Sequence, residues 1–274
     1  MKNKKHSIYY KFDADTCVKI HYLLILFNSL VLGGGTVALM WIGVLKDNNI
    51  IYILSLIIFV VYLFTRYIPG RMLQSVLYLD CDAKKMKEIV WIIEHKVKNE
   101  QAKTMWKYLR IQATFYMFGC EEESFQLLEC CEYVKKTFVN QLTHLSLYLN
   151  YYSRTRDWDN YKEVRMELET LPQRYVTSKK GMDGYELYMK GVMAKEKYVS
   201  GEIAESRKMC QELLNSNNLN MLNQVAVHSQ LAKMDIDEEK HESAKVHLDF
   251  VIENGGTTYY VEEAKPMLNE IKDR

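Results

Sequence analysis

The sequence predicts an all-α protein in which a two-helix transmembrane hairpin is followed by an α-solenoid of helix-turn-helix repeats. Only 3 Pro and 12 Gly interrupt its 274 residues, so helices meet few breakers. Two long apolar runs stand near the N-terminus, and the remainder consists of charged segments with apolar residues at helical spacing. We divide the chain into a basic N-terminal segment at 1–19, the hairpin at 20–68 and the helical repeat domain at 72–274.

The first apolar run, from Ile20 to Leu45, is long enough for a helix that crosses a hydrocarbon core of about 30 Å. A second run, from Ile50 to Phe64 and extendable to Ile68, contains no turn signal and is typical of a second span. Pro69 and Gly70 are expected to end it. A signal peptide is disfavoured because the first run is too long and lacks a small-residue cleavage site. A soluble core hairpin is disfavoured because two such runs leave too much apolar surface to bury.

The charges around the two runs predict their orientation. Only Lys46–Asn49 separate the runs, so they form an antiparallel hairpin whose two ends face the same side. Residues 1–19 contain five Lys and two Asp, a net charge of +3, and Arg66 and Arg71 follow the second run. By the positive-inside rule, both termini lie in the cytoplasm of a cell-membrane protein with two spans. No Asp, Glu, Lys or Arg lies inside either run, which favours an anchor in the lipid bilayer over a transporter.

Small residues cluster in the first run. Gly33, Gly34 and Gly35, followed by Ala38, place small residues at i and i+4 on one helical face. A phosphate-binding loop would need a Lys and a Ser or Thr after the glycines, whereas Thr36 follows here. We therefore predict transmembrane packing through this face, either within the hairpin or between protomers of a homo-oligomer.

The segment after Gly70 predicts helix pairs with a degenerate repeat. Helices are expected at 72–79, 83–98, 101–118, 122–136, 139–154, 159–170, 183–198, 202–215, 219–234, 241–252 and 258–271. Turns within pairs recur at Asp80, Cys120, Asp157, Glu202 and Lys240, which are 40, 37, 45 and 38 residues apart by subtraction. Such a period is typical of helix-pair solenoids, in which stacking buries the apolar face of each pair.

The last pair resembles the tetratricopeptide repeat. Leu231 and Ala232 match the apolar and small residues of its helix A, Ala244 matches the small residue that opens helix B, and Leu248 and Val251 match the apolar positions that follow. The resemblance extends more weakly over residues 72–256 and would also suit a generic α-solenoid. The segment 257–274 is expected to form a capping helix over the last exposed apolar face.

The resemblance implies that helix A of each pair lines a concave groove that holds an extended peptide. In that register, Ser146 and Asn150 lie on the inner face of one pair, Tyr116 on the pair before it and Lys233 on the last pair. Asn150 and Lys233 are the expected contacts to the backbone or carboxylate of a peptide, with Ser146 and Tyr116 beside them. The alternative is a solvated inner face without a ligand.

Composition argues against several other functions. The formal net charge of +1 provides no chain-wide field for nucleic acid. The histidines and cysteines show neither an H-E-x-x-H nor a C-x-x-C pattern, so we expect no metal, no cofactor and no enzymatic activity. We predict a membrane-tethered scaffold or adaptor that binds a protein or peptide. The alternative is an accessory subunit that packs against an integral membrane complex through its hairpin.

Overall fold

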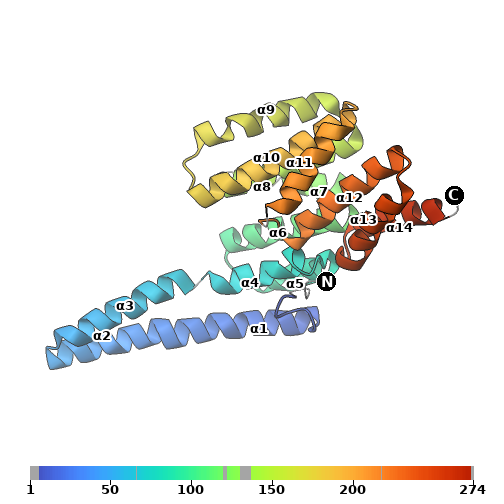
Figure 1. Cartoon of the computed structure of the whole chain (residues 1–274). Helices are drawn as coiled ribbons and strands as arrows, with labels where there is room; N and C mark the ends of the chain where they lie inside the picture. Colours follow the sequence, from blue (N-terminus) through green and yellow to red (C-terminus); the bar gives the residue numbers. More distant parts are fainter. Residues whose placement is uncertain (1–5, 66, 120–121, 130–136, 217, 273–274) are drawn as a thin grey trace. The chain divides into compact units, whose positions relative to one another are not determined.

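The computed structural model describes residues 6–65, 67–119, 122–129, 137–216 and 218–272, and every regular element in these ranges is a helix (Figure 1). The predicted all-α class is therefore confirmed. Contacts divide the chain into two compact units, Met1–Val76 and Leu77–Arg274, here called unit 1 and unit 2.

Unit 1 contains two long apolar helical stretches. The first runs without a break through α1 (Ala14–Phe27), the π-helix η1 (Asn28–Gly34) and α2 (Gly35–Lys46). The second begins with α3 (Asn49–Thr65), which packs against η1 and α2. Both stretches are long and apolar enough to cross a membrane, as the sequence predicted.

The turn between the two stretches is shorter than expected. α2 ends at Lys46 and α3 begins at Asn49, so two residues rather than four lie outside the helices. Asp47 adopts a left-handed conformation with φ of 46°. The side chain of Asn48 accepts a hydrogen bond from the backbone N–H of Ile50 at 3.0 Å, which starts α3.

The expected end of the second apolar stretch at Pro69 and Gly70 is wrong. α3 already ends at Thr65, and Pro69 and Gly70 lie in the first turn of α4 (Ile68–Tyr78). A proline is tolerated there because the first N–H groups of a helix have no intrahelical acceptor. The predicted helix at 72–79 therefore starts four residues earlier than expected, at Ile68, and ends at Tyr78.

Apolar side chains cover the outside of the two stretches. Leu45, Ile50 and Phe64 are 70%, 69% and 76% exposed. In the most apolar part of each stretch, only 6% of the residues are buried. A core helix of a soluble protein would bury such side chains. Unit 1 therefore leaves the surface of its apolar helices uncovered.

The helices after α4, all of which belong to unit 2, follow the predicted ones closely along most of the chain. They are α5 (Ala83–Lys96), α6 (Glu100–Phe118), α7 (Glu122–Glu129), α8 (Phe138–Thr155), α9 (Trp158–Arg174), α10 (Lys179–Val199), α11 (Ile203–Asn215), α12 (Met221–Asp237), α13 (His241–Asn254) and α14 (Tyr259–Lys272). The predicted turn at Cys120 and the end of the predicted helix at 130–136 lie outside the described residues. Along the chain, α8 packs against α9, α10 against α11 and α12 against α13 (Figure 1).

A residue with positive φ lies at or next to each of the five turns at which the sequence predicted a helix pair; for the turn at Cys120, which is not described, it is the preceding Gly119. These residues have φ between 54° and 83°. They are Cys81, Gly119, Arg156, Gly201 and Glu239, and they are 38, 37, 45 and 38 residues apart by subtraction. A left-handed residue ends a helix and reverses the chain within a short turn. The same type of helix-ending turn therefore recurs along unit 2.

The apolar core of unit 2 consists of clusters that share helices. One cluster joins α6, α7 and α8, a second joins α8, α9 and α10, and a third joins α10, α11 and α12. On α8, Leu147 belongs to the first cluster, whereas Leu145 and Leu149 belong to the second. The buried contacts thus pass from one group of helices to the next.

The loop before α14 returns to the beginning of unit 2. The backbone N–H of Thr257 donates to the carbonyl of Cys81 at 3.1 Å, and its hydroxyl donates to the Asp82 carboxylate at 3.0 Å. The backbone N–H of Lys84 donates to the same hydroxyl at 2.9 Å. A Cβ on Gly256 would lie 2.5 Å from the Cys81 carbonyl oxygen, so only glycine permits this approach.

Candidate functional site

The four predicted peptide-binding residues lie on three helices of unit 2. Tyr116 is on α6, Ser146 and Asn150 are on α8, and Lys233 is on α12; all four are half-buried. Tyr116 and Ser146 both lie near the side chain of Tyr188 on α10. Asn150 makes no side-chain hydrogen bond to another described residue. The structure therefore groups Tyr116 and Ser146 around Tyr188 and places Lys233 in a charged cluster.

This charged cluster is centred on Glu263 of α14. Glu263 Oε1 accepts a hydrogen bond from Arg154 Nη2 of α8 at 2.8 Å, and Glu263 Oε2 accepts one from Lys233 Nζ of α12 at 3.0 Å. Lys195 of α10 lies within electrostatic reach of all three residues. We call Arg154, Lys195, Lys233 and Glu263 the Glu263 cluster. It combines three cations with one carboxylate, a net charge of +2.

Burial and the neighbouring cations shift the pKa of Glu263 in opposite directions and the pKa of Lys195 in the same direction. Burial raises the pKa of Glu263, but Lys233 and Arg154 outweigh this effect and hold the pKa below its usual range. Burial lowers the pKa of Lys195 to about 8, assisted by Lys233 and Arg154 and opposed by Glu263. Within the described part of the chain, Lys195 has no carboxylate partner at hydrogen-bonding distance.

Tyrosine side chains gather next to the cluster. The Arg154 guanidinium lies over the ring of Tyr259, 4.3 Å from the ring centre, and the rings of Tyr259 and Tyr260 are 4.1 Å apart. Burial raises the pKa of Tyr116, Tyr188 and Tyr260, so their hydroxyl groups are neutral at physiological pH. These neutral tyrosines therefore supply aromatic surface and add no negative charge to the cluster.

Gly119, at the C-terminal end of α6, makes room for two members of this arrangement. It has φ of 83°, and a Cβ added to it would lie 2.8 Å from Arg154 Nη2 and 3.1 Å from Cγ of Tyr259. A side chain here would push the guanidinium away from Glu263. The turn after α6 thus helps to position a residue of α8 against α14.

Sequence reasoning did not identify Arg154, Lys195 or Glu263. Arg154 follows Asn150 by one helical turn and so lies on the same face, a signal that was present in the sequence. Lys195 follows Tyr188 by two turns in the same way. No sequence signal linked Glu263 to them, because the helix at 258–271 was expected only to cap the last pair. α14 does pack on α13 and α12, but it also contacts α6 and α8.

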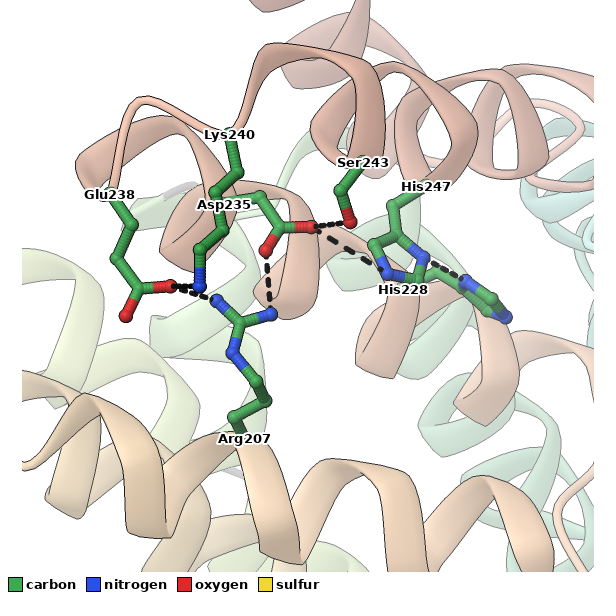
Figure 2. Close-up of polar contacts among 7 residues, drawn as sticks. All are labelled: Arg207, His228, Asp235, Glu238, Lys240, Ser243 and His247. Carbon is green, nitrogen blue, oxygen red and sulfur yellow. Dashed lines mark hydrogen bonds and ion pairs between the residues drawn. The ribbon is translucent and has the colours of Figure 1, made fainter.

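A second polar cluster, the Asp235 network, joins α11, α12 and α13 (Figure 2). Asp235 is fully buried, and its carboxylate accepts hydrogen bonds from Arg207 Nη1 and Ser243 Oγ, both at 2.5 Å. His247 Nε2 lies 3.8 Å from Asp235 Oδ2, and His247 Nδ1 lies 2.8 Å from His228 Nδ1. The network thus pairs a buried carboxylate with a cation and connects three helices.

The Asp235 network ties α11, α12 and α13 together through one buried ion pair and two histidines. Burial, and next His247, lower the pKa of His228 to about 4, and burial lowers the pKa of His247, so both rings are neutral at pH 7. Ser243 donates to the Asp235 carboxylate, which already pairs with Arg207, and not to a histidine, so within this network the hydroxyl does not face an imidazole base. The described residues also hold no group of three or more metal-ligating side chains.

The predicted transmembrane packing residues lie at the junction of η1 and α2 in unit 1. A Cβ on Gly33 would lie 3.7 Å from the Tyr62 ring, so Gly33 faces α3. A Cβ on Gly34 or Gly35 would meet no atom within 4 Å, and Ala38 is exposed. Gly33 therefore packs inside the hairpin, whereas the other three leave an open surface of small residues.

Comparison of the chain with protein-family models, with curated proteins and with solved structures finds no match in any of the three. The function is therefore inferred from the charged, aromatic and apolar surfaces described above. Fold alone would not decide it, because one fold serves many functions.

Proposed function

We propose that this chain is a membrane-tethered scaffold or adaptor that binds a protein or peptide partner on its helical repeat domain. The observation that carries the proposal is a contrast between the two units. Unit 1 exposes its apolar side chains, whereas the helices of unit 2 share buried clusters. A tether of this kind raises the effective concentration of any bound partner at the membrane.

In this proposal, α1–η1–α2 and α3 cross the cell membrane, and both termini lie in the cytoplasm. The uncovered apolar surface supports insertion, and the net charge of +3 in residues 1–19 supports the orientation. Protease added outside intact cells should leave unit 2 uncut, and permeabilised cells should lose it. Cleavage of unit 2 in intact cells would contradict this topology.

Unit 2 is, in the same proposal, a solenoid similar to tetratricopeptide repeats. Two features support it: the left-handed residue at each of five turns, and the buried clusters that share α8 and α10. Each helix group then completes the core of its neighbour. The inner helices α6, α8, α10 and α12 would carry the partner-binding residues.

Partner binding can be tested at Asn150 and Lys233. We expect the double variant Asn150→Ala/Lys233→Ala to lose partners that co-purify from crosslinked native membranes, as measured by mass spectrometry. Because Lys233 also pairs with Glu263, the matched control is Glu263→Gln, which weakens the same ion pair and keeps the cation. We expect Glu263→Gln to retain the partners. Full partner recovery by the double variant would exclude this binding surface.

A second candidate function is an accessory subunit that packs against an integral membrane protein. The open space around Gly34 and Gly35 favours it, since a neighbouring helix could approach closely there. Gly34→Leu should then abolish the complex while unit 2 stays folded, because the new side chain meets nothing within the hairpin. Val37→Leu, at a position that is 68% exposed, is the matched control. An intact complex with Gly34→Leu would rule out packing through this face.

A further inference from the structure

We propose that the Glu263 cluster binds a small dianion, such as phosphate or a dicarboxylate, beside Lys195. The site shares Lys233 with the peptide contacts proposed above, but Arg154, Lys195 and Glu263 are not among those contacts, and the site does not require that a protein partner exists. Its evidence is the charge balance of the cluster, the donors that its cations leave unused and the limited access to it.

The charge balance of the cluster is incomplete. Arg154 and Lys233 share the single carboxylate of Glu263, and Lys195 has no carboxylate partner in the described part of the chain. Like charges in a partly desolvated site repel one another and disfavour the charged forms. Among the described residues, two positive charges of the cluster therefore remain without a carboxylate partner, which matches the charge of a dianion.

Two of the three cations, Arg154 and Lys233, are held in place before any ligand arrives. Arg154, Lys195 and Lys233 project from α8, α10 and α12, and α10 packs against both of the other helices. The two hydrogen bonds to Glu263 fix two of these side chains at 2.8 and 3.0 Å. Charged donors that are already oriented lose little freedom when they bind an anion.

Hydrogen-bond donors remain for a further anion. A guanidinium carries five N–H groups and an ammonium carries three. Arg154 donates through Nη2 to Glu263, Lys233 donates one bond to the same group, and Lys195 donates none to the described residues. The two bonds to Glu263 also show that Arg154 and Lys233 donate to an anionic oxygen at hydrogen-bonding distance.

Access limits the size of the ligand. The side chains of Arg154, Lys233 and Glu263 are 29%, 36% and 26% exposed, and Lys195 is half-buried. The ring of Tyr259 covers one face of Arg154. A compact anion can reach the nitrogen atoms from solvent, whereas an extended chain would need more open surface than these side chains present.

The first test measures the reactivity of lysines in the full chain in neutral detergent micelles at pH 8. With a pKa of about 8, roughly half of Lys195 is neutral there and reacts with an acylating reagent, and peptide mass spectrometry reports the rate. We expect phosphate or succinate to slow acylation of Lys195 in a saturable manner. Acetate or chloride at equal ionic strength should not do so. Lys162, exposed on α9, is the internal control and should not respond.

The second test measures how much phosphate raises the midpoint of thermal unfolding in each variant. We expect Lys195→Gln to bind phosphate about 10-fold more weakly or worse, Lys162→Gln to match the wild type and Lys195→Arg to retain binding. The labelling test needs no variant, so it shows whether a dianion binds beside Lys195 even if Lys195→Gln does not fold. An equal phosphate response in Lys195→Gln and wild type would overturn the proposal. So would protection of Lys195 by an acidic peptide but not by phosphate, which would assign the cations to a protein partner.

Discussion

Lowering the pH from 7.5 to 5 should destabilise unit 2 through the histidine pair of the Asp235 network (Figure 2). His228 has a pKa of about 4 in the folded chain against 6.5 for a free side chain, because burial and His247 disfavour its charged form. The neutral ring therefore stabilises the fold above pH 6.5, and this stabilisation is lost as the pH falls toward 4. Full titration of His228 would lower the free energy of unfolding by ~3 kcal/mol. After allowance for solvent screening, about 1–2 kcal/mol of this stability is lost at pH 5.

The assay is the thermal unfolding midpoint of the full chain in micelles, followed by circular dichroism between pH 7.5 and 5. We expect the midpoint to fall by about 2–8 °C more in the wild type than in His228→Phe. Phe retains the ring that stacks on Phe250, whose centre lies 3.9 Å away, and removes the titration. His95→Phe, at an exposed position on α5, should keep the wild-type dependence on pH. Identical pH dependence in wild type and His228→Phe would refute this reasoning.

Three further predictions concern the stability of unit 2, measured by denaturant unfolding. Gly256→Ala should lower the free energy of unfolding by about 2 kcal/mol or more, because its Cβ would lie 2.5 Å from the Cys81 carbonyl oxygen and because φ at this position is 56°. An unchanged unfolding midpoint would contradict the close approach. Glu239→Gly should stabilise by about 0.5–1 kcal/mol, since φ of 58° strains any side chain, and a loss of stability would exclude that strain. Leu168→Ala should lower the free energy of unfolding by about 2–5 kcal/mol, because Leu168 is fully buried. Met166→Ala, at a position that is 59% exposed, should lower it by less than about 0.5 kcal/mol. Equal effects would place Leu168 outside the core.

Local signals in the sequence predict most helix boundaries of unit 2. α5 begins at Ala83 because the Asp82 side chain accepts a hydrogen bond from the N–H of Lys85 at 3.0 Å, and Asp157 caps α9 in the same way. Pro69 misled the prediction because proline both ends helices and begins them, and the sequence alone does not say which applies.

The candidate site depends on contacts that such signals do not encode. Arg154 and Glu263 are 109 positions apart, and apolar periodicity shows which face of a helix is buried but not which distant helix covers it. The glycine face illustrates the same limit. Gly33 and Gly34 looked equivalent in the sequence, yet only Gly33 meets the opposite helix, because one position further along turns a residue by about 100°.

The hydrogen bonds of Thr257 change how unit 2 is expected to unfold. A solenoid of the kind proposed above for unit 2 commonly frays from its ends, because a terminal repeat has one neighbour. Here the side chain of Thr257 holds Asp82, 175 positions away, so the segment that opens unit 2 and the one that closes it protect each other. Removal of residues 255–274 should therefore speed amide hydrogen exchange in α5 as well as in α13. The gain in cooperativity comes at a kinetic cost, since contacts so distant in sequence close late and slow folding.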